Sequence, residues 1–157
     1  MMTQMQNDQK ITNFSAKATS NSIVNLSDYK DKSHLVIYFY PKDSTPGCTT
    51  EGQNFRDLYQ EFQTSETEIF GVSRDTMKQH ENFKEKQSFP FELIADENGE
   101  ICQLFGVWQL KKTFGKEYMG IVRSTFLIDK QGVLRKKWLN VRVKDHANEV
   151  LQAVKEL

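Results

Sequence analysis

The sequence predicts an α/β fold in which a central mixed sheet has helices on both of its faces. Three observations lead to this prediction. Short, continuous apolar runs alternate along the chain with segments whose apolar residues recur at helical spacing. Two further apolar runs, at residues 125–129 and 133–139, are joined by a turn that ends on Gly132, which predicts an antiparallel hairpin. A last amphipathic helix follows this hairpin and completes the alternation.

The length and composition of the chain fit one domain. Its 157 residues can bury a sizeable core, and its 21 basic and 21 acidic side chains create no net field that would attract nucleic acid or an acidic membrane. No signal-like segment opens the chain, and no run is long enough to span a bilayer. With only two cysteines, far apart, we expect a cytoplasmic protein with a flexible tail at residues 1–10 and a single domain at residues 11–157.

The first part of the domain is expected to form an accessory hairpin and then a central strand. Ile11–Phe14 and Ile23–Leu26 flank a polar turn and predict two short strands. Ser27 is a candidate cap for a short turn after them. Leu35–Tyr40 is a run of β-branched and aromatic residues, which is typical of a strand buried on both faces. Pro41 ends this strand because it has no N–H to donate.

The helix that follows has a well-marked start. Thr45 suits the N-cap, Pro46 the first helical position and Gly47 the second. The apolar face of this helix repeats at i, i+3, i+4 and i+7 and consists of Phe55, Leu58, Tyr59 and Phe62. Cys48 therefore falls in the first turn, where free backbone N–H groups and the helix dipole favour an anion. A thiol at this place should ionise more easily than a free one, and the thiolate is the nucleophile.

Strands and helices continue to alternate after this helix. In chain order, the expected elements are a strand at Ile69–Ser73, a helix capped by Asp75, a strand at Glu92–Ala95, a short helix that contains Cys102, and a final helix opened by Asp145. Residues 109–120 are predicted to form the longest loop and to border a site. The three histidines show no ligand spacing with either cysteine, so no metal site is predicted; they are His34, His80 and His146.

An unpaired cysteine such as Cys48 is more often a small buried hydrophobe than a nucleophile. The tight strand-to-helix turn before it favours the nucleophile here. A dithiol oxidoreductase would have Cys-x-x-Cys at this point, but the chain has Thr45 where the first sulfur would be. The Thr45 hydroxyl can donate to the thiolate or to a substrate oxygen, which suits the chemistry of a single thiolate.

The pattern Pro41-x-x-x-Thr45-x-x-Cys48 is similar to the active-site motif of the peroxiredoxins. The wider resemblance is to the Q-type, or bacterioferritin comigratory protein, subfamily, and it runs from about Ile11 to the C-terminus. The segments that carry it are Tyr38–Asp43, Thr45–Glu51, Trp108 and Tyr118–Asp129. The resemblance implies a thioredoxin-like α/β sandwich and a thiol-dependent peroxidase for hydrogen peroxide and small organic hydroperoxides, with no metal, haem or flavin cofactor.

The same resemblance implies roles for the site residues. Cys48 would attack one peroxide oxygen and become a sulfenic acid, while Thr45 and Arg123 hold the peroxide and stabilise the departing oxygen. Pro41 would shield the sulfur from water. A carboxylate at Glu51, one turn beyond Cys48, would by itself disfavour the thiolate, but the resemblance implies that it orients Arg123. Without the resemblance, Arg123 and Glu51 would be ordinary solvated charges.

The sequence departs from many Q-type relatives at the resolving cysteine. Many relatives have it five residues after the first cysteine, where this chain has Gln53, and others have it in the next helix, where residues 77–87 contain none. Cys102 or an external thiol remains. Because a buried core cysteine is the commoner case, we predict a one-cysteine mechanism.

The expected reductant is thioredoxin, glutaredoxin with glutathione, or another thiol, acting on a monomer or weak homodimer. The sequence leaves one alternative from another class of protein. In a redox-regulated sensor or holdase, oxidation of Cys48 would change a binding surface, and peroxide turnover would be incidental.

Overall fold

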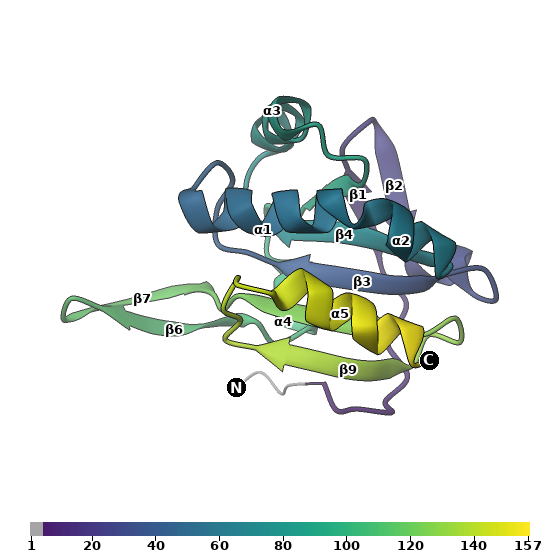
Figure 1. Ribbon diagram of the computed structural model, residues 1–157. Coiled ribbons are helices and arrows are strands. Elements are labelled where there is room, and N and C mark those ends of the chain that lie inside the picture. The colour runs from purple at the N-terminus through teal and green to yellow at the C-terminus, as the bar shows by residue number, and fades with distance from the viewer. Residues whose placement is uncertain (1–4) are drawn as a thin grey trace.

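A seven-stranded mixed sheet forms the centre of the computed structural model, which describes residues 5–157 (Figure 1). The strands are β1 (Ser15–Ala18), β2 (Ser22–Asn25), β3 (His34–Phe39), β4 (Thr67–Ser73), β5 (Glu92–Ala95), β6 (Trp108–Thr113), β7 (Lys116–Ile121), β8 (Ser124–Ile128) and β9 (Leu134–Leu139). The helices are the 3₁₀ helix η1 (Leu26–Tyr29), α1 (Pro46–Asp57), α2 (Tyr59–Thr64), α3 (Met77–Gln87), α4 (Glu100–Leu104) and α5 (His146–Lys155).

The strand order of the large sheet is β2-β1-β5-β4-β3-β8-β9, and β6 and β7 pair only with each other. β3 lies near the centre, parallel to β4 and antiparallel to β8. β8 and β9 form the predicted antiparallel hairpin. The mixed α/β sandwich expected from the sequence is therefore confirmed.

The sheet separates two hydrophobic layers. Because side chains alternate along a strand, β3 sends Leu35, Ile37 and Phe39 into one layer and Val36 and Tyr38 into the other. The second layer is covered by α1, α2, α3 and α5, three of which are seen in front of the sheet in Figure 1. The first layer is closed by α4, η1 and the N-terminal segment. Helices therefore cover both faces, as predicted.

The N-terminal segment differs from the expected flexible tail. Within residues 5–10, Met5 is buried in the core and the Asp8 N–H donates to the carbonyl oxygen of Leu134 in β9. β9 is the edge strand of the sheet, and this segment satisfies part of its open edge. The tail prediction is thus wrong for residues 5–10, while residues 1–4 lie outside the described part of the chain.

Several element boundaries also differ. The first strand is not Ile11–Phe14 but Ser15–Ala18, although Ile11 and Phe14 are buried as apolar residues should be. The predicted helix over residues 46–62 breaks at Leu58 into α1 and α2. At η1 the residue in the cap position is Asn25 rather than Ser27.

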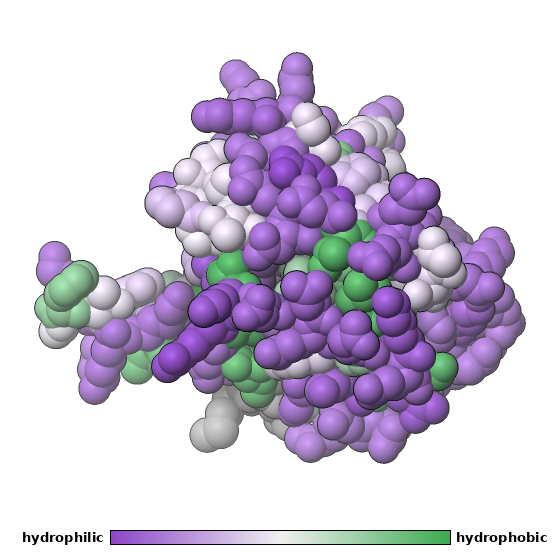
Figure 2. Space-filling model, in the orientation of Figure 1, coloured by the Kyte–Doolittle hydropathy of each residue, from purple (hydrophilic) through white to green (hydrophobic). Residues whose placement is uncertain are grey.

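Two other sequence predictions are corrected. α3 is capped by Thr76, which forms a capping box with Gln79, and Asp75 instead turns its carboxylate inward. Residues 109–120 are not a loop but most of the β6–β7 hairpin, which projects from the body in Figure 1. Its exposed apolar residues are Leu110, Phe114, Tyr118 and Met119, and Figure 2 shows apolar surface on this projection. No helix within residues 5–157 is long and apolar enough to cross a membrane.

Candidate active site

The turn from β3 to α1 has the geometry that the sequence predicts. The Tyr40 N–H still donates to the carbonyl oxygen of Val72, at 3.1 Å, and the chain then leaves the sheet at Pro41. Thr45 occupies the N-cap with extended backbone angles, and α1 begins at the next residue, a proline. Cys48 is therefore in the first turn of α1, and its side chain is only 2% exposed.

Arg123 reaches this turn from the start of β8, the strand that pairs with β3. β8 runs antiparallel to β3 with Ser124 opposite Phe39, so Arg123, one residue earlier, lies beside the end of β3. Its Nη2 atom donates to Cys48 Sγ at 3.3 Å, and its Nη1 atom donates to Glu51 Oε1 at 2.6 Å. The structure thus brings together three residues that the sequence singled out.

Gly47 makes the approach of the guanidinium possible. A Cβ atom at this position would lie 3.3 Å from Arg123 Nη2, closer than most real Cβ contacts. A larger residue at position 47 would push the donor away from the sulfur. The sequence placed Gly47 correctly in the first helical turn, but its role beside Arg123 depends on a residue 76 positions later.

The charged side chains next to the Cys48 sulfur, Glu51 and Arg123, are largely buried. Burial raises the pKa of Glu51 to about 7, although the charge and hydrogen bond of Arg123 act in the opposite direction. Burial lowers the pKa of Arg123, but Glu51 and Cys48 outweigh this effect and raise it overall. Burial and Arg123 together lower the pKa of His146 to about 4, so its ring adds no charge at neutral pH. The guanidinium of Arg123 is the cation that contacts Cys48 Sγ.

Thr45 has a defined hydrogen bond within the turn, whereas Pro41 lies at its surface. The Thr45 hydroxyl donates to the carbonyl oxygen of Lys42, at 2.9 Å, and this bond closes the loop instead of capping α1. Its oxygen keeps lone pairs that can accept a hydrogen bond from a peroxide O–H. Pro41 is exposed at the start of the loop, and its shielding of the sulfur stays a prediction.

Cys102 lies apart from Cys48, on the opposite side of the sheet. It belongs to the layer closed by α4, whereas Cys48 belongs to the layer covered by α1. Its side chain is fully buried, and burial, followed by the negative charge of Asp96, raises the pKa of its thiol far above the ordinary value. Both cysteines are free. Cys102 therefore has the surroundings of an inert core cysteine.

A hydrogen-bonded cluster next to the site was missed by the sequence analysis. Asp43, Asp75 and His80 are buried and bring ligand-type atoms within 4.8 Å of one another. These atoms bond to protein donors and acceptors, so the cluster is a hydrogen-bond network. One signal was available: Asp43 and Asp75 lie four and two residues beyond the carboxyl ends of β3 and β4, adjacent parallel strands whose carboxyl ends meet at the same edge of the sheet.

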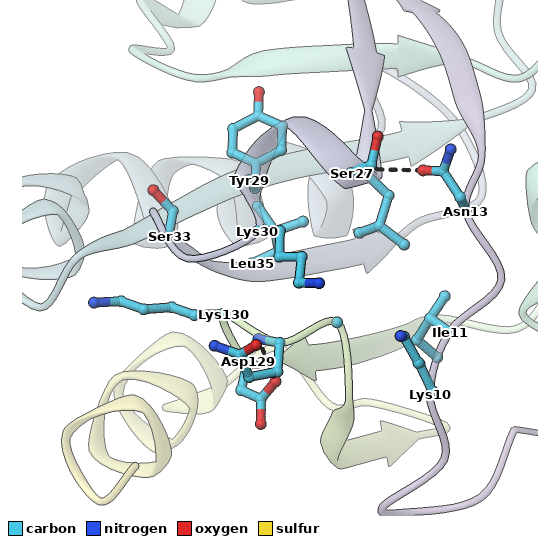
Figure 3. Close-up of a pocket in the computed structure, with 13 residues that line it drawn as sticks. Lys10, Ile11, Asn13, Ser27, Tyr29, Lys30, Ser33, Leu35, Asp129 and Lys130 are labelled. Carbon is cyan, nitrogen blue, oxygen red and sulfur yellow. Dashed lines mark hydrogen bonds between the residues drawn. The ribbon is translucent and has the colours of Figure 1, made fainter.

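A cavity of about 260 Å³ lies elsewhere, at the opposite end of β3 (Figure 3). Its lining comes from the N-terminal segment, η1, the start of β3 and the turn between β8 and β9. Ile11, Leu26 and Leu35 form apolar walls, and Lys10 and Lys30 also line it. None of the predicted site residues lines this cavity, so it is separate from the candidate active site.

Comparison with known proteins identifies the family. The model of the AhpC/TSA family matches residues 8–137. The chain belongs to this family. It is 52% identical to the peroxiredoxin Bcp of Bacillus subtilis over 149 residues, which cover 95% of this chain and 94% of that protein. It is 50% identical to the peroxiredoxin Bcp of Xanthomonas campestris over 121 residues, covering 77% and 76% of the two chains.

Solved structures agree with this assignment. One of the Xanthomonas campestris bacterioferritin comigratory protein, from work on its alkyl peroxide reduction activity, has a TM-score of 0.87 and 43% identity, covering 91% of this chain and 90% of that one. A cysteine-to-serine mutant of Xylella fastidiosa PrxQ has a TM-score of 0.93 and 37% identity, covering 98% of each chain. The chain is a Q-type peroxiredoxin with a thioredoxin-like fold, as the sequence predicted.

The buried carboxyl of this peroxiredoxin leads to a testable pH dependence. The pKa of Glu51 rises from 4.5 to about 7 on folding, so its contribution to stability is present below the unfolded value and is lost as pH rises through about 7. We expect Glu51→Gln to remove this loss. The free energy of unfolding of the variant minus that of the wild type should be about 2 kcal/mol larger at about pH 8 than at about pH 5. Urea unfolding at both pH values measures it, and an equal difference at both would contradict it.

Proposed function

We propose that Cys48 is the nucleophile through which this thiol-dependent peroxidase reduces hydrogen peroxide and small organic hydroperoxides. One observation carries the proposal: Arg123 Nη2 lies 3.3 Å from Cys48 Sγ while its Nη1 is held by the buried Glu51. A fixed cation at the first turn of a helix favours the thiolate and leaves further donors for a substrate oxygen. Multiple-turnover consumption of peroxide, lost in Cys48→Ser, tests it.

The proposed reaction is a displacement at oxygen. The Cys48 thiolate attacks one peroxide oxygen, the S–O bond forms, and the O–O bond breaks. The sulfur becomes a sulfenic acid, and the other oxygen leaves as hydroxide or alkoxide and takes up a proton to give water or an alcohol. Arg123 stabilises the charge that develops on the departing oxygen, and the Thr45 hydroxyl accepts from the peroxide O–H. Pro41 limits the access of water to the sulfur.

An external thiol then restores the enzyme in a one-cysteine cycle. This part of the proposal is supported by the position of Cys102, which is buried in the layer on the other face of the sheet. It is also supported by Gln53 in α1 and by the absence of cysteine from α3. Thioredoxin, glutaredoxin with glutathione, or another thiol would form a mixed disulfide with Cys48 and release it by exchange. Because Cys48 is 2% exposed, the first turn of α1 must open for this step.

The remaining parts of the proposal concern the protein in the cell. We infer that residues 11–157, with residues 5–10 packed against them, form a single catalytic domain that works as a monomer or weak homodimer. All of the site residues named above come from this one stretch of chain. The two free cysteines fit the reducing conditions of the cytoplasm.

The role of Arg123 predicts a large loss of rate in Arg123→Met. Methionine keeps much of the apolar stem but deletes the donors that face the sulfur and the departing oxygen. We expect the second-order rate constant of Cys48 with hydrogen peroxide to fall roughly 100-fold, which corresponds to about 3 kcal/mol. Stopped-flow measurement of the first oxidation step checks this.

Arg56→Met is the matched control for this measurement. Arg56 lies in the last turn of α1 and binds Asp57 and the carbonyl oxygen of Gln87, away from Cys48 in the first turn. Its replacement should leave the peroxide rate unchanged. A fall of less than about threefold in Arg123→Met, under about 1 kcal/mol, would show that the guanidinium does not assist the reaction.

A second prediction concerns the missing resolving cysteine. α1 is continuous from Pro46 to Asp57, and on an intact helix residues five apart are separated by about 7.5 Å of rise, beyond the reach of a disulfide. A thiol introduced by Gln53→Cys can therefore meet Cys48 only when the first turns unwind. We expect this variant to form the disulfide after peroxide treatment, while the wild type keeps a trappable sulfenic acid. Intact-mass analysis with and without a thiol trap distinguishes the two.

Cys102→Ala is the control in both backgrounds and should change neither outcome. If the wild type is instead converted quantitatively to an intramolecular disulfide between Cys48 and Cys102, the one-cysteine mechanism is wrong. The sheet between the two residues would then have to open during the catalytic cycle.

A further inference from the structure

We propose that His80 and Asp75 are positioning residues for peroxide reduction. They hold residues 41–45, here called the catalytic loop, in the conformation that places Thr45 next to Cys48. The inference rests on the proposed role of Cys48. Neither residue touches the sulfur, so both act through the loop.

The anchor point within the catalytic loop is Asp43. Its neighbours at positions 42 and 44 are exposed, but Asp43 itself is 7% exposed and turns its carboxylate inward. Oδ2 lies 2.6 Å from His80 Nδ1, and Oδ1 accepts from the Tyr40 hydroxyl at 2.6 Å. The Asp43 backbone N–H donates to Asp75 Oδ2 at 2.9 Å. Both the side chain and the main chain of the loop are therefore tied to the protein interior.

The two partners of Asp43 are themselves fixed. His80 is fully buried on α3, and its Nε2 lies 2.9 Å from the carbonyl oxygen of Ile94 in β5. Asp75 follows β4 and accepts a short hydrogen bond from the Ser73 hydroxyl. The loop is thus connected to β4, α3 and β5, none of which carries Cys48 or Arg123.

The two ring nitrogens of His80 set a condition on the form of its ring. Both ring nitrogens of His80 face acceptors, the Asp43 carboxylate on one side and the Ile94 carbonyl on the other. A neutral imidazole has only one N–H, so a ring that donates to both acceptors carries two hydrogens and a positive charge. Removing one partner of a buried pair leaves the other charge uncompensated, which disturbs a structure more than losing a neutral hydrogen bond.

The backbone of the loop needs such an anchor. Ser44 has φ of +61°, in the left-handed region that side-chain-bearing residues rarely adopt. Such a conformation persists only where the surroundings impose it. Ser44 stands directly between Asp43 and Thr45, so release of Asp43 would let it relax and would move Thr45. The bond from Thr45 to the Lys42 carbonyl would be lost with this change.

This arrangement predicts a split between two reactions of Cys48. Thiolate formation depends on Arg123, Glu51 and the start of α1, which lie outside the network. Peroxide must in addition be aligned with the sulfur, and small errors of alignment have large effects on rate. Loss of the network should therefore slow the reaction with peroxide much more than alkylation by a simple electrophile.

The test compares His80→Gln and Asp75→Ala with the wild type in two single-turnover reactions. We expect the rate constant of Cys48 with hydrogen peroxide to fall roughly tenfold or more, while its rate with iodoacetamide changes less than about threefold. In steady state with excess thiol, the KM for peroxide should rise. Asp75→Asn keeps an oxygen for the Asp43 N–H and should retain most of the peroxide rate.

Thr67→Val is the matched control, because Thr67 is buried at the far end of β4 and donates to the Ser65 carbonyl oxygen. It should lower stability without separating the two rates. Peroxide rates in His80→Gln and Asp75→Ala that equal the control would overturn the proposal, as would equal loss of both reactions. If Cys48→Ser kept peroxidase activity, the proposed function would fail instead.

A measurement on the wild type covers the case in which the variants do not fold. Nitrogen-15 NMR should show two ring N–H groups for His80 at neutral pH, the signature of an imidazolium. A single ring N–H would exclude the ion pair on which the anchoring depends.

Discussion

The contact between Arg123 and Cys48 joins two parts of the chain that are 75 residues apart, and the rest of the site is arranged around it. It depends on the pairing of β3 with β8, because the register that sets Phe39 opposite Ser124 also sets Arg123 beside the start of the catalytic loop. A shift by one residue would turn the side chains of β8 to the opposite face. The buried aromatic and β-branched residues of the two strands hold this register.

Glu51 orients Arg123 for this contact and makes the contact sensitive to pH. Its Oε1 holds Arg123, but its Oε2 is buried without a hydrogen-bond partner among the described residues. The hydroxyl of Tyr38 is in the same situation, and after burial the charge of Glu51 is the largest cause of its raised pKa. Burial raises the pKa of this carboxyl to about 7, so the charge that orients Arg123 changes around neutral pH.

The features that the sequence predicted share one property: they depend on local spacing. The alternation of strands and helices and the position of Cys48 follow from apolar periodicity and helix-start residues. Arg123 and Glu51 were found only through the family resemblance, because no local pattern links them to Cys48. The β6–β7 hairpin was missed because two successive lysines in β6, Lys111 and Lys112, and two successive apolar residues in β7, Tyr118 and Met119, interrupt the expected alternation. His80 is fully buried on α3, and sequence spacing alone cannot show which polar groups its ring contacts.

The chain is held more firmly before Cys48 than after it. Upstream, Asp43 is bonded to residues from three other positions in the fold. Downstream, α1 begins with Pro46 and Gly47 and contains Gly52, where the Phe89 ring occupies the space a Cβ would need. Glycine weakens a helix by about 1 kcal/mol relative to alanine, so the helical side opens more easily than the anchored loop. Opening from the helical side would expose an oxidised Cys48 to a reductant while the loop that aligns the next peroxide stays in place.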